Sequence, residues 1–524
     1  MNLIKTVSII SGWTAISRIL GMAREMLMTY YFGVGFVSDA FIVAFKLPNF
    51  FRRFLADGAF SSILVPEYSR RLSKDPPHVI DQFKNNIFTH LLLFLTLLVL
   101  CVEIFAPYVV RFIAPGMDMN PQQSQIVTEF IRINFPFIMF IALSTFYASL
   151  LNSHGHFSTS SALPVVLNIV MVAGLCLPAS NTLTKGYIVS WSVMVAGILQ
   201  LVWVFLRSYH IKINIKLVKP VIDPGFKVFI KKLLPSMFGA GVMQINLLID
   251  IQLASYLGTG ALSYLYYADR LYQLPLSMFG IAIGTSLLPY LTKLWANNRG
   301  EDVYKVQNQS LILVLFLNIP AAIGLIVLAQ PIIELIYGRG SFSAFDVTQT
   351  YKVLQAYALG LPAYVCSKIF LSTFYSLGDT KTPFKIAGIS VLSNFIFNII
   401  LMNFLGFVGL ALATSITAYI QTFLLGHTLT QHQHLKIQKK LWVQVGKILF
   451  LGLLMGLGVH YFYIYMHGIV QKIPFLISIS GSLSKIGLTF FSIGFGLGIY
   501  MLCSSKMGFI QQFKAFKQDL KESI

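Results

Sequence analysis

The sequence contains few charged residues, and acidic ones are the scarcest. Only 11% of its 524 residues are Asp, Glu, Lys or Arg, whereas a soluble domain carries about a quarter. Asp and Glu together number 19, against 39 Lys and Arg. Hydrophobic residues make up 56% of the chain, and the mean hydropathy is +0.73. This composition excludes an ordinary soluble protein and indicates a chain that lies in a lipid bilayer.

Motifs that carry enzymatic, redox or nucleotide chemistry are also missing from the sequence. The four cysteines are scattered, without a CxxC or other metal-ligand spacing, and we interpret them as small apolar residues. No G-x-x-x-x-G-K-[ST] loop occurs, which argues against direct coupling to ATP. The ten histidines form no cluster with acidic residues, because the pairs His154/His156 and His432/His434 lie in polar loops. We therefore expect no enzyme.

Long apolar runs account for most of the chain. A helix that crosses a bilayer needs about 20 mainly apolar residues, and the sequence predicts fourteen such helices, hence an all-α polytopic membrane protein. The first run contains Arg18 and Arg24 and continues too long for a cleavable signal peptide. The expected spans are roughly 5–32, 37–66, 87–113, 126–150, 157–179, 186–206, 228–257, 262–292, 308–330, 350–376, 384–404, 407–429, 441–465 and 480–503.

Basic residues are distributed unevenly between the connections. If the N-terminus is cytoplasmic, the connections after even-numbered spans face inward, and they hold most of the Lys and Arg. The opposite connections offer little beyond Arg111, Lys185, Arg339 and Lys472. This positive-inside bias predicts that both termini are cytoplasmic. Topology and anionic lipid headgroups explain the net charge of +20, so we expect membrane lipids and no nucleic acid as partners.

An internal repeat divides the sequence at an offset of about 226 residues. Four matches recur in the same order: Tyr31–Gly35 with Tyr256–Gly260, Gly58–Arg71 with Gly280–Lys293, Leu143–Tyr147 with Leu371–Tyr375, and Asn168 with Asn394. The offset contains an even number of spans, so both copies have the same orientation. We expect six-helix bundles at 1–215 and 225–430, followed by two additional helices at 441–505. Two bundles with a cleft between them favour transport by alternating access.

Charged residues occur inside several expected spans, at a cost of about 2.5–3.5 kcal/mol each. One interpretation is that they reach the interface or pair with one another, as Arg53 and Asp57 would at a spacing of four residues. The other is that arginines of the first two spans of each bundle line a hydrated cavity. Guanidinium groups suit phosphate and carboxylate, so such a cavity implies an anionic substrate. The candidate cavity residues are Arg18, Arg24, Arg52 and Arg270, with Asp39, Asp57 and Asp269 moderating the field.

Four segments resemble the MurJ/MviN family of lipid II flippases, within the MATE-like exporters of drugs, lipid-linked oligosaccharides and polysaccharides. These segments are Ser17–Glu25, Ser38–Pro66, Tyr266–Pro289 and Gly378–Ile386. The resemblance implies translocation of lipid II, the lipid-linked peptidoglycan precursor, to the outer leaflet of the bacterial inner membrane for cell-wall synthesis. It also implies that the last two helices form a groove for the polyprenyl tail. The family's substrate-binding positions correspond to Arg18, Arg24, Asp39, Arg52 and Arg270, supported by Arg53, Asp57 and Asp269.

Some members of this family hold Na⁺ between their seventh, eleventh and twelfth helices. The corresponding residues here are Asp250, Asn394, Asn398 and Thr414, and Asn398 replaces a second carboxylate. This set is compatible with Na⁺ or H⁺ as a coupling ion, or with Asp250 as a buried acid satisfied by its neighbours. We expect no other cofactor and a monomeric transporter.

Other functions stay open at this point. A flippase for another undecaprenyl-pyrophosphate-linked saccharide would share the anionic anchor, whereas a drug antiporter would need an acidic cavity. A membrane enzyme of lipid-linked sugars or a scaffold for cell-wall synthesis is a further alternative.

Overall fold

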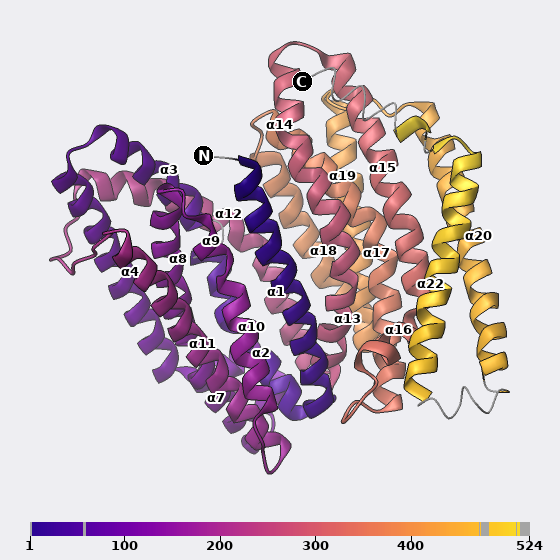
Figure 1. Ribbon diagram of the computed structural model, residues 1–524, viewed down its shortest axis with the longest axis horizontal. Helices are drawn as coiled ribbons and strands as arrows, with labels where there is room; N and C mark the ends of the chain where they lie inside the picture. The colour runs from indigo at the N-terminus through magenta and orange to yellow at the C-terminus, as the bar shows by residue number, and fades with distance from the viewer. Residues whose placement is uncertain (1–2, 56–58, 471, 473–480, 510, 514–524) are drawn as a thin grey trace. The chain divides into compact units, whose positions relative to one another are not determined.

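The protein is described by a computed structural model that covers residues 3–55, 59–470, 472, 481–509 and 511–513 (Figure 1). In these residues every regular element is a helix, as the composition predicts. The elements are α1 (Leu3–Phe32), α2 (Phe36–Leu55), α3 (Ala59–Lys74), α4 (Pro77–Ile104), α5 (Ala106–Ile113), α6 (Pro115–Asp118), α7 (Pro121–Asn134), α8 (Phe137–Ser153), α9 (Phe157–Ser161), α10 (Leu163–Cys176), α11 (Thr182–His210), α12 (Pro224–Ser255), α13 (Ala261–Pro275), η1 (Leu276–Ile281), α14 (Ala282–Ala296), α15 (Gly300–Val327), α16 (Ala329–Tyr337), α17 (Ala344–Ser376), α18 (Lys381–Leu405), α19 (Phe407–Gln431), α20 (Lys439–Val470) and α22 (Gly481–Lys506).

Ten helical segments in the described residues are long and apolar enough to cross a membrane. They correspond to ten of the fourteen predicted spans. The other four predicted spans, at 5–32, 37–66, 228–257 and 262–292, are helical too but do not belong to this set. They are the first two spans of each expected bundle, and each contains ionisable residues. The fold is therefore an all-helical polytopic membrane protein.

The chain forms two compact units. The first comprises residues 1–263 together with 340–342. In it α8 packs against α3, α4 and α11, while α10 packs against α1 and α11. Helix α12 packs against α2, α3 and α4 in this unit, although the repeat assigns it to the second bundle. The two units are defined by contacts between helices, whereas the predicted bundles are defined by the sequence repeat. The units therefore do not test the predicted division at 1–215, 225–430 and 441–505, which stays a prediction.

The second unit comprises residues 264–339 and 343–524. Helix α17 lies at its centre and packs against α14, α15, α16 and α19. The last two helices follow as a pair: α20 packs on α15, and α22 packs on α20 and α16. A shared apolar core joins these helices, and it includes Leu315, Ile369, Leu425 and Met455.

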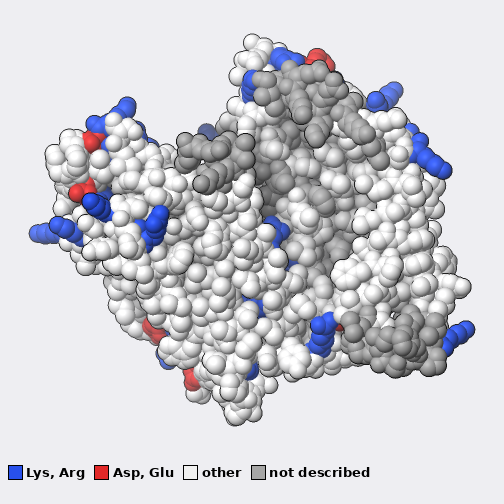
Figure 2. Space-filling model, in the orientation of Figure 1, with Lys and Arg blue, Asp and Glu red and all other residues white. Residues whose placement is uncertain are grey.

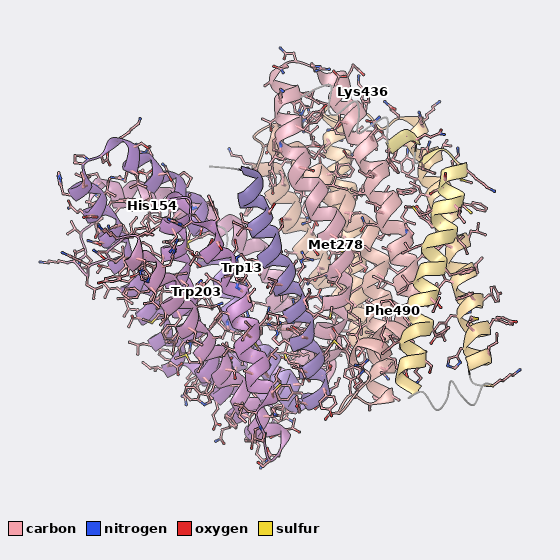
Figure 3. The ribbon with its side chains drawn as sticks, in the orientation of Figure 1. Trp13, His154, Trp203, Met278, Lys436 and Phe490 are labelled. Atoms are coloured by element: carbon pink, nitrogen blue, oxygen red, sulfur yellow. The ribbon has the colours of Figure 1, made fainter. Side chains whose placement is uncertain are left out.

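On one flank of the second unit, charged side chains lie near the helix ends. On the flank formed by α15, α20 and α22, Figure 2 shows Lys and Arg at both ends and an uncharged band between them. Large apolar residues are exposed within such bands, as Trp203 on α11 and Phe490 on α22 illustrate, with exposed fractions of 47% and 62% (Figure 3). In water this exposure would be unfavourable, so these bands fit contact with lipid.

One matched glycine of the repeat has a positive φ in both copies. Gly33 begins the turn between α1 and α2 with φ of +58°, and Gly258 occupies the turn between α12 and α13 with φ of +87°. A positive φ strongly favours glycine, because a Cβ would clash with the backbone. The repeated glycine is thus explained by turn geometry at both places.

An asparagine in the first half of each of two helices bonds to the linker that follows each expected bundle. On α4, Asn86 accepts a hydrogen bond from the Val221 N–H (3.0 Å) and donates one to the Val221 carbonyl (2.7 Å). On α15, Asn308 accepts from the Gln438 N–H (3.2 Å) and donates to the carbonyl of Lys436 (2.8 Å), which is labelled in Figure 3. We call this arrangement the asparagine clasp. It occurs once in each unit.

A helix irregularity follows Pro275. The π-helical segment η1 begins at the next residue and contains Gly280. Proline lacks a backbone donor, so the regular hydrogen-bond pattern is interrupted at Pro275, next to this segment. In α2, by contrast, Pro48 lies inside a continuous helix.

Candidate functional site

Arg24 is the candidate residue with the most fully defined surroundings. It lies on α1 with 11% of its side chain exposed, and its Nη2 contacts Glu25 Oε1 at 2.5 Å. Its Nη1 donates a hydrogen bond to Asn168 Oδ1 on α10 at 3.0 Å. Asn168 is itself fixed, because its Nδ2 donates to the Ser17 carbonyl at 3.0 Å. The guanidinium also lies 5.8 Å from the ring of Phe45 on α2.

These contacts explain how the first unit tolerates a charge inside a span. Glu25 balances the charge of Arg24, and Asn168 supplies a neutral acceptor, which reduces the desolvation cost. A guanidinium held in one orientation presents its planar donors in a fixed direction, and this geometry suits phosphate or carboxylate oxygens. The surroundings of Arg24 are therefore compatible with binding an anion.

Arg18 and Arg52 lie in the same unit as Arg24. Arg18 is exposed on α1, and Arg52 is half-buried near the C-terminal end of α2. The ring of Phe51 packs edge-on against Phe135, with centroids 5.6 Å apart, and this contact fixes the end of α2. Substrate contact by either arginine stays a prediction.

Asp39 has a different environment from the arginines. It lies in the first turn of α2, is 1% exposed, and receives three hydrogen bonds from the start of α13. The Gly260 N–H donates to its Oδ2 (2.5 Å), while the N–H and hydroxyl of Ser263 donate to its Oδ1 (2.8 and 2.6 Å). The carboxylate thus caps a helix N-terminus, where a negative charge is favourable. Its substrate role stays a prediction, beside this anchoring role.

Arg270 and Asp269 are neighbours on α13 in the second unit. The Arg270 guanidinium lies 4.6 Å from the centroid of the Tyr266 ring, one turn earlier on the same helix. Asp269 Oδ2 accepts a hydrogen bond from Gln273 Nε2 at 2.5 Å. Both side chains are half-buried, and α13 ends shortly after them at Pro275. A cation over an aromatic face keeps its charge at a lower desolvation cost.

Asp57 lies outside the described residues, and Arg53 is described only as part of the α2 backbone. Their predicted pairing and support of the site are therefore untested.

The candidate sodium residues are distributed over both units. Asp250 is half-buried on α12 of the first unit. On α18 of the second unit, buried Asn398 donates from Nδ2 to Asn394 Oδ1 at 2.9 Å, and Thr414 on α19 donates to the Leu410 carbonyl at 3.0 Å. Among the described residues, no group of three or more His, Cys, Asp or Glu side chains converges as metal ligands. This observation does not test a site built from amide and hydroxyl oxygens, so the sodium site stays a prediction.

Lys368 is a candidate that the sequence analysis did not single out. It lies half-buried in the long helix α17, and it makes no ion pair within the described part of the chain. Gly284 of α14 approaches it closely: a Cβ at Gly284 would lie 3.4 Å from Lys368 Cβ. An unbalanced lysine inside a span usually marks a functional position. Its presence in an otherwise uncharged run of α17 is the sequence signal that could have identified it.

Comparisons with known proteins agree with the resemblance of the sequence motifs. The family model described as "Lipid II flippase MurJ" matches residues 28–479. A relative from Rickettsia prowazekii (strain Madrid E), described as "Probable lipid II flippase MurJ", is 33% identical over 94% of this chain and 97% of its own length. The chain belongs to the lipid II flippase MurJ family.

Solved structures extend this assignment to the fold. A lipid II flippase MurJ in an inward closed conformation matches with a TM-score of 0.77 and 28% identity, and covers 95% of this chain and 98% of its own. An inward-facing MATE family transporter of the MOP superfamily matches with a TM-score of 0.63 and 13% identity, covering 80% and 94% respectively. The second likeness concerns the fold alone. The MurJ family consists of transporters, not enzymes, and this member is a multi-pass membrane protein of the bacterial inner membrane.

Proposed function

We propose that this MurJ family member translocates lipid II from the cytoplasmic to the outer leaflet of the inner membrane by alternating access. Family membership over nearly the whole chain carries the proposal. The arginine-bearing first helix adds a physical reason, because Arg24 is held by Glu25 and Asn168 in an orientation suited to an anion. Both termini would be cytoplasmic, following the positive-inside bias. The protein would work as a monomer among membrane lipids, without nucleic acid.

The pyrophosphate of lipid II would be bound by arginines. Arg24 and Arg52 would contribute from the first unit, and Arg270 from the second. A pyrophosphate carries several acceptor oxygens, and a charge-assisted hydrogen bond contributes about 1.5–3 kcal/mol. Arg18 would attract the headgroup from its more exposed position on α1. Asp39 would contribute mainly by holding the connection between α12 and α13.

The polyprenyl tail would lie against α20 and α22. Both helices expose apolar side chains, including Leu453 (58% exposed) and Leu497 (57% exposed). Such a surface can bind an extended hydrocarbon chain, because the hydrophobic effect is non-directional. The tail would thus remain in an apolar environment while the headgroup crosses.

The driving force would come from Na⁺, H⁺ or the membrane potential. Moving one elementary charge across 100 mV is worth about 2.3 kcal/mol. Sodium would bind Asp250 together with Asn394, Asn398 and Thr414, whereas a proton would need Asp250 alone. Replacing Na⁺ by choline in the medium distinguishes sodium from proton coupling. Transport should stop in choline only if Na⁺ is the coupling ion.

A complementation assay tests the proposed function. Cells depleted of their own lipid II flippase should regain outer-leaflet lipid II when they express this chain. Arg24→Ala and Arg270→Ala should reduce that signal by about tenfold or more, because each removes a charged contact with the pyrophosphate. Arg299→Ala is the matched control, since Arg299 is exposed and pairs only at the surface with Asp302 (2.7 Å).

The possible results test the arginine assignment and the identity of the substrate separately. Full rescue by both cavity variants would contradict the arginine assignment. Failure of the parent chain, despite normal insertion, would contradict lipid II as the substrate; the assay would then be repeated with another undecaprenyl-pyrophosphate-linked saccharide.

A further inference from the structure

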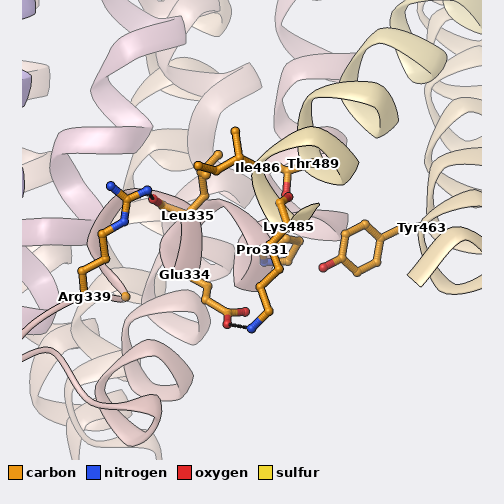
Figure 4. Close-up of a pocket in the computed structure, with 9 residues that line it drawn as sticks. Pro331, Glu334, Leu335, Arg339, Tyr463, Lys485, Ile486 and Thr489 are labelled. Atoms are coloured by element: carbon orange, nitrogen blue, oxygen red, sulfur yellow. Dashed lines mark hydrogen bonds and ion pairs between the residues drawn. The ribbon is translucent and has the colours of Figure 1, made fainter. Parts of the chain in front are cut away.

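A polar pocket of about 100 Å³ lies between α16, α20 and α22 in the second unit. Its basic residues are Arg339, two residues after the end of α16, and Lys485 on α22 (Figure 4). Tyr463 projects from α20 with its hydroxyl toward the pocket (Figure 4). One acid is present: Glu334 Oε1 contacts Lys485 Nζ at 2.6 Å. The formal charge of these side chains is therefore positive.

The C-terminal end of α16, where the helix dipole is negative, lies at this pocket. The carbonyl of Glu334 accepts a hydrogen bond from the Gly338 N–H at 3.0 Å, and the carbonyl of Leu335 accepts one from Arg339 Nη2 at 3.2 Å. These bonds occupy two acceptors of the last turn, and the charge of Arg339 offsets the dipole. Arg339 is exposed and, within the described residues, forms no ion pair with a carboxylate.

Basic residues are rare on the predicted outer side, which makes their convergence informative. Arg111 pairs with Asp118 at 2.9 Å, and buried Lys185 donates to the Leu175 carbonyl at 2.9 Å. Local structure thus explains both. Arg339 and Lys485 instead line one pocket, and the positive-inside tendency gives no reason for basic residues at this end of the helices.

The surroundings of the pocket indicate that its ligand is a lipid. Phe490 lies one helical turn after Ile486 of the pocket lining and is 62% exposed, and the same helix also exposes Phe491 (73%). On α20, Ile464 is 54% exposed. Exposed apolar side chains are thus present beside the polar pocket on α20 and α22. A phosphate with attached acyl chains could contact both the polar pocket and the apolar side chains beside it, whereas a free anion would contact only the polar pocket.

We propose that this pocket binds the phosphate of an anionic phospholipid from the outer leaflet, with its acyl chains along α20 and α22. Arg339 and Lys485 supply the charge, and the Tyr463 hydroxyl supplies a further donor. Glu334 competes with the phosphate for Lys485. None of the arginines proposed to bind the substrate lines this pocket, although the acyl chains would share the surface of α20 and α22 with the proposed polyprenyl tail.

Native mass spectrometry of the purified full-length chain tests the site. Phosphatidylglycerol should bind more tightly than phosphatidylcholine with the same acyl chains, because only the former carries a net negative charge. Arg339→Gln should weaken phosphatidylglycerol binding by about tenfold, the loss expected for one charge-assisted hydrogen bond. Glu334→Gln should strengthen it several-fold, because Lys485 is released from its ion pair. Lys472→Gln is the matched control, since Lys472 is exposed on the same predicted side but does not line the pocket.

Three results would overturn the proposal. The first is equal retention of phosphatidylglycerol by the parent and Arg339→Gln, with unchanged melting temperatures. The second is weaker binding in Glu334→Gln, which would show that the ion pair supports the helices rather than competing with the ligand. The third is displacement of the lipid by millimolar inorganic phosphate, which would identify a site for free phosphate. Retained preference for phosphatidylglycerol in the presence of phosphate supports a lipid site.

Discussion

Replacing Asp39 by Ala should destabilise the protein strongly, because this carboxylate satisfies buried donors. The N–H groups of Gly260 and Ser263 both bond to it, and both residues are buried. An unsatisfied buried donor costs about 1–3 kcal/mol, so losing two acceptors should cost about 2–6 kcal/mol. The Ser263 hydroxyl is affected less, because it has a second hydrogen-bond partner in Ser38 Oγ at 2.9 Å.

The Asp39→Asn variant should lose only part of the stability that Asp39→Ala loses. Asp39→Asn keeps one oxygen and replaces the other by an NH2 group, which would face an N–H donor. We therefore expect about half the loss, roughly 1–3 kcal/mol. The measurement is the free energy of unfolding of purified protein in a denaturing-detergent titration, with apparent melting temperatures as a second readout.

Asp302→Ala serves as the control for loss of an acid. Asp302 pairs with Arg299 at 2.7 Å, but both side chains are nearly half exposed, so the loss should stay below about 1 kcal/mol. The reasoning would be refuted if Asp39→Ala unfolded like the parent. A variant of normal stability that has lost only transport would assign Asp39 to the substrate instead of the helix cap.

Two further predictions concern charges elsewhere in the chain. Lys368→Met should raise the free energy of unfolding by about 1 kcal/mol or more, because it removes an unbalanced intramembrane charge, and should lower transport; a variant that is less stable would reveal a structural partner of Lys368. Near α6, hydrogen bonds from Ser124 and Arg111 hold the pKa of Asp118 below its usual value of 3.8. A folded-state pKa below the unfolded one means that the unfolded chain binds more protons, so this contribution is present above pH 3.8 and is lost as the pH falls through the lowered pKa. Melting temperatures measured between about pH 2 and 5 should therefore fall less steeply with acid in Asp118→Asn than in the parent, and parallel curves would contradict this.

The fold class could be predicted from sequence because a bilayer imposes a strong constraint on composition. Ten of the expected spans have helices that satisfy length and hydropathy. Those at 5–32, 37–66, 228–257 and 262–292 do not belong to this set. Their ionisable residues weaken the local hydropathy signal, and three of these four spans contain a segment that resembles the MurJ family. The ionisable residues thus make these spans harder to recognise by hydropathy, and the same residues indicate the function.

Side-chain partners could not be predicted, because they depend on packing between helices. The sequence shows Arg24 beside Glu25, but only the packing of α10 on α1 brings Asn168 to the guanidinium. Asp39 was expected among cavity charges on residue type alone. Its role at the start of α13 depends on residues more than two hundred positions away. Lys368 was missed because one lysine hardly alters the apolar character of a long helix.

The asparagine clasp has a consequence for the order of events during synthesis. Asn86 contacts the linker through Val221 and Asp223, and all of these residues leave the ribosome before α12 begins at Pro224. At about 5–20 residues per second, the remaining three hundred residues require many seconds. Helix α4 can therefore bind the linker at Val221 and Asp223 while the helices of the second unit are still being translated. The equivalent contact of Asn308 closes only after Gln438 has emerged, so the two halves are secured in turn.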